Sequence, residues 1–234
     1  ECDWSSDVCS SDLRQSEDRV RGNTSEATIT ITIVRTGWSR ELTMHAWSKG
    51  RLLSMILVQS PAKEKGTVFL KRGKEVWNWI PSIERSIKLP PSMMSQSWMG
   101  TDFTNDDLVK ESSVTDDYTH RMIGEQNIMG LPCFQIEMIP KPEAAVVWGK
   151  VVVWVDKKDL MQMKIEFYDE DGVLVNVINA LKTGLISGRM LPVSMEMIPM
   201  QKKGQKTIMT YSDLIFDQPI EDSFFTTNNM KLIR

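Results

Sequence analysis

The sequence predicts a mainly β protein with a few helices, in which antiparallel strands form a sandwich or a barrel-like sheet. Segments with alternating apolar and polar residues follow one another along most of the chain. Short turns separate these segments, as is typical of such folds. One helical stretch, residues 88–109, interrupts the pattern. There is no internal repeat and no linker-like segment, so residues 14–234 are predicted to form one domain.

The first thirteen residues are interpreted as foreign to this domain. The segment Asp3 to Leu13, DWSSDVCSSDL, resembles the translation of a common short-read sequencing adapter in one reading frame. Residues 1–13 are therefore predicted to be an adapter-derived artefact, and the native N-terminus, with any signal peptide, to be missing. Only Cys133 then remains of the three cysteines, so the domain is expected to have no internal disulfide.

The composition excludes some classes of function. A net charge of −3 and the lack of a basic run argue against a nucleic-acid surface. No uninterrupted apolar run reaches the roughly eighteen residues of a membrane-spanning helix. The chain is rich in methionine and tryptophan, with 16 and 8 residues. Because methionine side chains adapt to apolar partners of varied shape, this composition is compatible either with a core or with an apolar binding surface.

The first half of the chain begins with the end of a truncated helix at residues 14–23. Ala27 to Val34 then alternates isoleucine with threonine, which predicts a strand with one wet face. The pair Trp77 and Trp79 should share one face of a later strand. The other strands of this half are predicted over residues 42–48, 52–58, 67–71, 75–80 and 86–89.

The stretch from Lys88 to Val109 is predicted to form two short helices. Pro90 and Pro91 suit a helix start, and Gly100 suits a C-terminal stop. Thr104 and Asp107 have the spacing of a capping box for the second helix. The apolar side consists of Met93, Met94, Trp98 and Met99. Two interpretations remain open here: a crossover that fills the core, or a movable lid over an apolar cavity.

The second half of the chain is predicted to be almost wholly strands. They are expected over residues 118–122, 133–139, 146–155, 161–168, 173–182, 189–200 and 206–216. The strand at 146–155 is apolar throughout, which predicts that both of its faces are covered. Alternation in the others predicts apolar faces made of Phe134, Ile136 and Met138, then of Met161, Met163, Ile165 and Phe167, and then of Leu191, Val193, Met195 and Met197.

Groups with catalytic chemistry are scarce. His45 and His120 are the only histidines, and neither belongs to a zinc-binding spacing or a nucleophile motif. The acidic turn 169–172 lacks the spaced ligands of a calcium loop. Cys133 stands beside Phe134 in a predicted strand, which favours a buried side chain over a nucleophile. We therefore predict no catalytic residue, no metal, no cofactor and no enzymatic activity.

The segment GTVFLKRGKEVWNWIPSIERSIKLPPSMMSQSWMGTDFTNDDLV, residues 66–109, resembles the hallmark segment of bacterial outer-membrane lipoprotein-sorting proteins of the LolA-like group. Three further segments resemble other parts of the same group: IPKPEAAVVWGKVVVWVDKKDL (139–160), EFYDEDG (166–172) and PIEDSFFTTNNMKLIR (219–234). The resemblance covers nearly the whole chain after Arg14. It implies a periplasmic carrier with a single curved antiparallel sheet, an incomplete β-barrel whose concave apolar face is closed by short helices and holds acyl chains.

The resemblance also implies partners. These are an acylated lipoprotein or another lipid, an inner-membrane transporter of the ABC or RND type and an outer-membrane acceptor, for a monomeric protein that binds no nucleic acid. The lid is assigned to the apolar side of residues 88–109 named above. The lipid-binding cavity is assigned to Ile29, Ile31, Ile33, Phe134, Ile136, Met138, Met161, Met163, Ile165, Phe167, Met195 and Met197.

Two other classes of function stay open at this stage. An accessory protein of an RND-type (MMPL-like) lipid exporter would need an exposed docking patch and no cavity. An esterase would need a nucleophile and a base, which the sequence does not offer.

Overall fold

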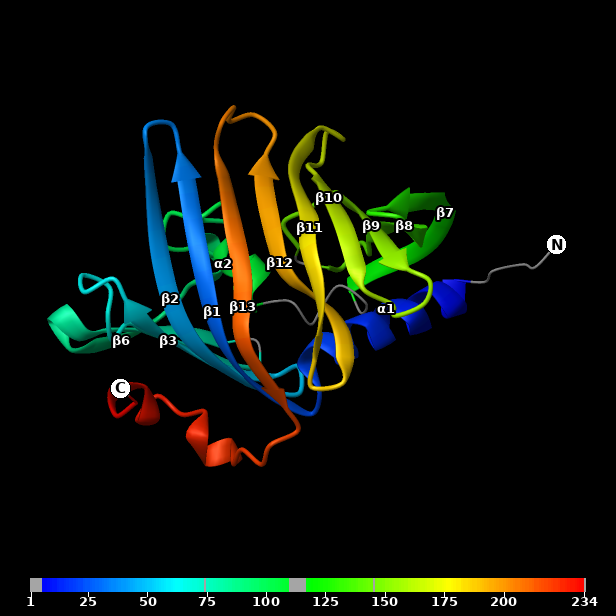
Figure 1. Ribbon diagram of the computed structural model, residues 1–234. Coiled ribbons are helices and arrows are strands. Elements are labelled where there is room, and N and C mark those ends of the chain that lie inside the picture. The colour runs from blue at the N-terminus through cyan, green and yellow to red at the C-terminus, as the bar shows by residue number, and fades with distance from the viewer. Residues whose placement is uncertain (1–5, 74, 110–116, 145, 234) are drawn as a thin grey trace. The chain divides into compact units, whose positions relative to one another are not determined.

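A computed structural model describes residues 6–73, 75–109, 117–144 and 146–233 (Figure 1). The chain divides into two compact units. Unit 1 contains Glu1–Val20 and Ser112–Lys206, and unit 2 contains Arg21–Glu111 and Thr207–Arg234. Each unit is built on antiparallel strands with its own buried clusters.

The strands of unit 2 lie in the order β6-β5-β4-β3-β2-β1-β13. Their bounds are β1 Thr24–Arg35, β2 Trp38–Lys49, β3 Leu53–Ser60, β4 Val68–Arg72, β5 Glu75–Ile80, β6 Arg85–Lys88 and β13 Lys206–Phe216. The predicted strands of the first half are confirmed; β1, β2 and β3 are longer than predicted, and β4, β5 and β6 have the predicted length. The strand pairs from β1 to β6 are all consecutive antiparallel hairpins.

Alternation along these strands gives the unit 2 sheet two chemically different faces. One face, which we call the tail face, contains Met55, Leu57, Val68 and Leu70, packed with the partly buried Trp77 and Trp79. The C-terminal residues Phe225 and Met230 belong to the same cluster. Phe225 directly follows the 3-10 turn η3 Asp222–Phe224, and Met230 lies in the 3-10 turn η4 Asn229–Lys231. The end of the chain therefore covers the tail face.

The opposite face, which we call the lid face, carries Phe69 between the tail-face residues Val68 and Leu70. The ring of Phe69 packs against Trp98, with centroids 5.3 Å apart. Trp98 belongs to the segment predicted to be helical. This segment, residues 89–109, is called the lid segment below. It lies on the side of β4 opposite to the C-terminal turns, so both faces of that strand are buried.

The lid segment has less helix than predicted. The first helix is a single 3-10 turn, η2 Pro91–Met93, and the second is α2 Asn105–Val109. The capping box is confirmed: the amide of Asp107 donates to Thr104 Oγ1 at 3.0 Å, and the amide of Thr104 donates to Asp107 Oδ2 at 2.8 Å. A bridge between Ser97 and Thr104 holds the two parts together. Residues 94–104 therefore form a compact loop rather than a longer first helix.

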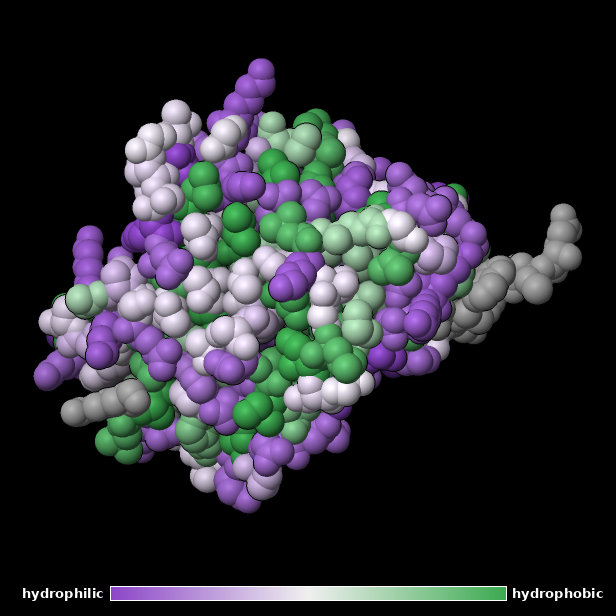
Figure 2. Space-filling model, in the orientation of Figure 1, coloured by the Kyte–Doolittle hydropathy of each residue, from purple (hydrophilic) through white to green (hydrophobic). Residues whose placement is uncertain are grey.

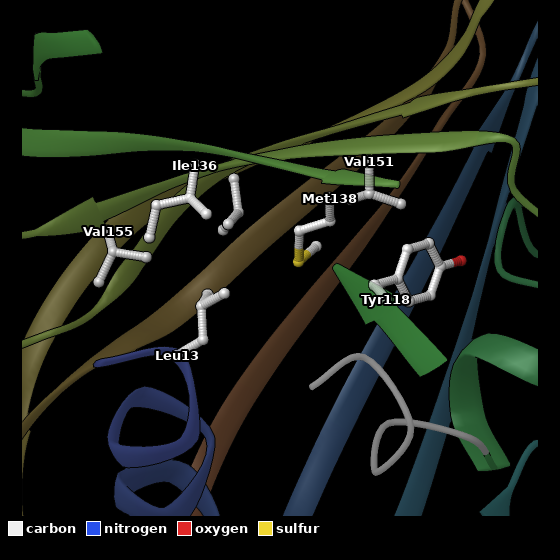
Figure 3. Close-up of a cluster of buried hydrophobic side chains, with 7 residues drawn as sticks. Leu13, Tyr118, Ile136, Met138, Val151 and Val155 are labelled. Atoms are coloured by element: carbon white, nitrogen blue, oxygen red, sulfur yellow. The ribbon is translucent and has the colours of Figure 1, made fainter. Parts of the chain in front are cut away.

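The strands of unit 1 lie in the order β12-β11-β10-β9-β8-β7. They are β7 Tyr118–Ile128, β8 Leu131–Pro140, β9 Lys150–Asp156, β10 Gln162–Tyr168, β11 Leu174–Ile186 and β12 Arg189–Pro199. One face of β9 contributes Val151, Val153 and Val155 to a cluster with Ile136, Met138, Tyr118 and Leu13 (Figure 3). The other face contributes Val152 and Trp154 to a second cluster. The prediction that both faces of this strand are covered is confirmed.

Helix α1, Ser6–Arg21, packs on the first of these clusters through Leu13. Its second half confirms the helix predicted before residue 23. The boundary that we assign to the adapter, after residue 13, lies inside this helix. The assignment of residues 1–13 to an adapter stays a prediction.

One predicted face in unit 1 is wrong. Met161 and Met163 lie in the cluster with Val152 and Trp154, whereas Ile165 and Phe167 pack on the cluster with Val151 and Val153. The cause is an irregularity in the pairing of β10 with β9 between Gln162 and Lys164. An extra residue in one strand reverses the alternation beyond it, so the four side chains do not share a face.

The fold class is confirmed: the chain is mostly antiparallel β, and the strand order ends at β6 in unit 2 and at β7 in unit 1 without closing. Within the described ranges, no helix combines the length and apolarity needed to cross a membrane. On the surface shown in Figure 2, hydrophilic and hydrophobic residues are interspersed.

The packing of the C-terminal turns can be tested with Phe225→Ala. Because Phe225 is fully buried in the tail-face cluster, we expect the variant to lower the free energy of unfolding by about 3 to 5 kcal/mol. The control is Leu232→Ala in the same segment, where the side chain is 73% exposed and the change should be within about 0.5 kcal/mol. Urea unfolding followed by tryptophan fluorescence gives both values, and equal stability of the two variants would contradict this packing.

Candidate functional site

The lid face of unit 2 has an apolar floor made by three neighbouring strands. Ile29, Ile31 and Ile33 of β1, which were assigned to the cavity, are all buried; their role in binding lipid stays a prediction. In the register of the sheet, Ile29 lies opposite Met44 and Ile31 lies opposite Leu42. Met44 in turn lies opposite Val58 of β3. Cross-strand partners point to the same side of a sheet, so these side chains form one continuous apolar surface.

Trp98 is the only one of the four predicted lid residues that is fully buried, with 2% exposure. Met93, Met94 and Met99 are half-buried. The segment around Trp98 holds its own shape: the amide of Trp98 donates to the Phe103 carbonyl at 2.8 Å, and the amide of Thr101 donates to the Trp98 carbonyl at 2.9 Å. The lid segment therefore presents one large aromatic side chain to the sheet from a loop stabilised by internal hydrogen bonds.

A buried ion pair fastens this loop to the sheet. Arg35 Nη1, at the end of β1, donates to Asp102 Oδ2 at 2.9 Å, and Arg35 Nη2 donates to the carbonyl of Gly100 at 2.9 Å. The side chains of Arg35 and Asp102 are only 13% and 3% exposed. Thr207 of β13 completes the contact, because its hydroxyl donates to Asp102 Oδ2 at 2.7 Å. We call Arg35, Asp102 and Thr207 the latch.

A second arginine holds the same loop from the neighbouring strand. Arg40 Nη2, at the start of β2, donates to the carbonyl of Met99 at 2.6 Å, and Arg40 Nη1 contacts Glu64 Oε1 at 3.0 Å. Met99 and Gly100 both have positive φ angles, 50° and 78°, which aim their carbonyls at the two arginines. Such a conformation is strained for methionine and easy for glycine.

Neither arginine was predicted from the sequence to be a site residue. A signal was available: Arg35 continues the alternation of Ile31 and Ile33, and Arg40 precedes Leu42 by two residues. Both therefore lie on the apolar side of their strands, beside the hairpin tip. What the sequence did not show was that each arginine also donates to a backbone carbonyl of the lid segment, far away in the chain.

The other positions assigned to the cavity lie in unit 1 and do not form one surface. Phe134, Ile136 and Met138 share the cluster of Val151 and Val153, together with Ile165 and Phe167. Met161 and Met163 lie on the other side of the sheet. In the β11–β12 pair, Met195 and Met197 lie opposite Ala180 and Ile178. The lipid-binding role of this whole set stays a prediction.

Reactive groups in the described ranges are isolated from one another. His45 Nε2 lies 2.7 Å from Glu26 Oε1 on the tail face, and its ring packs against Trp47. His120 belongs to unit 1. Burial is the main cause that raises the pKa of the Cys133 thiol, and the charge of Asp156 adds to it, so the thiolate form is disfavoured. The part of the chain that the structure describes contains no cluster of three or more potential metal ligands.

The latch predicts a measurable coupling between loop and sheet. In Asp102→Ala, Arg35 loses its carboxylate partner in a buried position, so we expect the loop around Trp98 to be destabilised by about 3 kcal/mol or more. Hydrogen exchange of the amides at 98–104 measures this loss. The control is Arg121→Ala, which removes an ion pair with Glu137 at an arginine whose side chain is 74% exposed. The free energy of unfolding of this variant should change by at most about 1 kcal/mol. Unchanged exchange in Asp102→Ala would show that the latch does not hold the loop.

The burial of Cys133 predicts that its thiol is alkylated slowly in the folded protein. We expect iodoacetamide to modify Cys133 at pH 8 far more slowly in the folded protein than in urea, because the thiol is buried and its pKa is raised. Peptide mass spectrometry of the Cys133 peptide reports the two rates separately from those of Cys2 and Cys9. Similar rates in the folded and unfolded protein would contradict the burial of this side chain.

Comparison with known proteins identifies the fold. A family model with the description "-like: Uncharacterized protein" matches residues 50–232, well over half of the chain. No curated protein matches the sequence. A solved domain assigned to outer membrane lipoprotein-sorting proteins, from Vibrio parahaemolyticus, is similar with a TM-score of 0.86 and 23% identity, over 97% of this chain and 100% of that one.

Two other solved structures are similar along their whole length. One is a DUF1329 family protein from Desulfovibrio piger, with a TM-score of 0.86, 23% identity, and coverage of 95% and 98% of the two chains. The other is a LolA superfamily protein from Nitrosomonas europaea, with a TM-score of 0.79, 23% identity, and coverage of 94% and 97%. The resemblance drawn from the sequence is thus confirmed at the level of the fold. The chain belongs to the family that the matching model describes, and its fold is the LolA-like fold of outer membrane lipoprotein-sorting proteins.

Proposed function

We propose that this protein is a periplasmic carrier that shields the acyl chains of a lipoprotein or another lipid and delivers them towards the outer membrane. The observation that carries the proposal is the continuous apolar lid face of unit 2 beneath a loop that two arginines fasten in place. A face of this kind, covered by a latched loop, suits a ligand that must be enclosed and later released. The names of the similar structures from Vibrio parahaemolyticus and Nitrosomonas europaea support the same class of function.

The physical need for such a carrier is large. Exposing an acyl chain of about fifteen methylenes to water costs roughly 12 kcal/mol, at about 0.8 kcal/mol per methylene. This cost corresponds to a partition factor of roughly a billion, so an acyl chain does not cross an aqueous compartment unescorted. Ile29, Ile31 and Met44 offer the apolar contacts that replace water around the chain.

Release requires that the closed state be only moderately favoured over the open one. The lid segment meets the sheet through the contact of Trp98 with Phe69 and through charged and polar contacts from Arg35, Arg40 and Thr207. Opening exchanges these contacts for water, whose hydrogen bonds replace part of what is lost. In the proposed cycle a transporter of the inner membrane loads the monomeric carrier and an outer-membrane acceptor unloads it.

The proposal is tested by native mass spectrometry and lipid extraction on the full chain exported to a bacterial periplasm. We expect the wild-type protein to carry co-purified lipid or acylated peptide. Trp98→Ala removes the most buried of the four predicted lid side chains and should carry several-fold less lipid, because a bound chain then exchanges with membranes. The matched control is Trp38→Ala, where the tryptophan is 53% exposed at a hairpin tip, and it should retain lipid as the wild type does.

Two results would contradict the carrier proposal. The first is a folded wild-type protein that contains no lipid after purification and binds no added acyl ligand. Equal lipid content in Trp98→Ala and the wild type would mean that the lid segment does not retain the ligand.

A further inference from the structure

The lid segment reverses direction in a tight turn at Met99 and Gly100. The amide of Thr101 donates to the carbonyl of Trp98 at 2.9 Å, and the two residues between them have φ angles of 50° and 78°. Positive φ angles at both central positions define a type I′ turn, which favours Asn-Gly because these two residues tolerate the left-handed conformation. Methionine tolerates it poorly, because its Cβ then lies too close to the following carbonyl oxygen. The turn therefore holds backbone strain at Met99.

The carbonyls of this strained turn are the groups that fasten the lid segment to the sheet. Arg40 Nη2 donates to the Met99 carbonyl at 2.6 Å, and Arg35 Nη2 donates to the Gly100 carbonyl at 2.9 Å. A side chain at Gly100 would place its Cβ 3.6 Å from Arg40 Nη2, so the guanidinium group lies directly against the turn. Hydrogen bonds from a charged donor are about twice as strong as neutral ones. The two arginines thus stabilise a conformation that methionine disfavours.

Strain and fastening oppose each other when the lid segment opens. Opening breaks the two arginine contacts, which costs free energy, and it frees the turn from the geometry that these contacts impose. Met99 then returns to a negative φ angle, and its strain is released. The open state is therefore more populated than it would be if the arginine contacts acted alone.

The chain contains a second Met-Gly turn of the same type. Met129 and Gly130 have φ angles of 52° and 81°, and they join β7 to β8, where Ile128 lies opposite Leu131. Met129 is 55% exposed. This turn has the same backbone conformation as the turn of the lid segment, but it closes a regular hairpin of unit 1. It provides an internal control for the effect of strain on stability.

We propose that the strain at Met99 weakens the closed state of the lid segment, so that this residue sets how readily the lid opens and releases its ligand. The inference rests on the proposed carrier function for the ligand, and it adds the residue that regulates release. A left-handed residue with a Cβ is disfavoured enough to change an opening equilibrium by roughly tenfold. Without this strain, a lid held by two arginines and the buried Trp98 would release its ligand more slowly.

The first measurement is hydrogen exchange of the Trp98 and Thr101 amides in the full chain, expressed as protection relative to the unfolded sequence. Met99→Gly and Met99→Asn relieve the strain, whereas Met99→Ala keeps a Cβ in the left-handed conformation. We expect protection to be roughly fivefold or more higher in Met99→Gly and Met99→Asn than in Met99→Ala. The alanine variant is the reference because all three variants lose the half-buried methionine side chain, and only the strain differs.

The matched control is Met129→Asn in the turn between β7 and β8. This variant relieves the same kind of strain at an exposed position, so it makes global unfolding rarer, as Met99→Asn does. Protection of the Trp98 and Thr101 amides should nevertheless stay at the wild-type level, because the lid segment opens locally, without global unfolding.

The second measurement is the transfer of a pyrene-labelled fatty acid from the protein to vesicles of phosphatidylethanolamine and phosphatidylglycerol. We expect the half-time of transfer to be several-fold longer in Met99→Asn than in Met99→Ala, in proportion to the difference in protection. Met129→Asn should transfer the fatty acid as the wild type does.

The outcomes separate this inference from the carrier proposal. If protection is equal in Met99→Gly, Met99→Asn and Met99→Ala, the turn moves as a rigid unit and the inference is overturned. If protection differs as expected but the half-times of transfer are equal, opening of the turn does not limit release, and the regulatory role of Met99 is wrong. If protection differs and no variant binds the fatty acid, nor does the wild type, the carrier proposal is contradicted and the strained turn stands. Should Met99→Ala fail to fold, Met99→Asn and the wild type decide in the same way, because the wild type retains the strain.

Discussion

Both faces of strand β4 are buried, and the arrangement of unit 2 depends on what covers each of them. In β4 the neighbours Val68, Phe69 and Leu70 are all buried, although alternate side chains point in opposite directions. The C-terminal turns cover one side through Phe225 and Met230, and the lid segment covers the other through Trp98.

The two covers differ in the contacts that they make. The C-terminal cover is a hydrophobic cluster, whereas the lid segment combines the contact of Trp98 with Phe69 and charged hydrogen bonds from Arg35 and Arg40. The second kind of cover can open at lower cost.

This difference gives the lid face its proposed role. The latch of Arg35, Asp102 and Thr207 stands at one end of the apolar floor. A bound acyl chain would then be enclosed beside the latch, and opening would depend on the residues of the latch.

The strands and their turns could be predicted from sequence because alternation and turn residues are local signals, and the hairpin with Trp77 and Trp79 on one face is a clear case. The capping box at Thr104 and Asp107 is local in the same way.

Three features depend on residues far apart in the chain or on strand pairing, and they were not predicted. The irregularity between Gln162 and Lys164 reverses the face of Met163 without any glycine or proline to mark it. The C-terminal turns pack on a surface that β3 and β4 form together, so no local sequence signal identifies their position. The partners of Arg35 and Arg40 are backbone carbonyls more than fifty residues away, which no spacing in the sequence reveals.

The most direct test of the account is to locate a bound acyl chain on the protein. A fatty acid with a photoreactive diazirine near its methyl end can be bound to the full chain, activated by light and mapped by peptide mass spectrometry. We expect labels on the lid-face strands at Ile29, Ile31 and Met44 and on the lid segment at Trp98, and we expect excess unlabelled fatty acid to suppress them. Labels on the tail-face residues Thr28, Thr30 and Thr32, or labels that excess fatty acid does not reduce, would contradict the claim that the lid face is the binding surface.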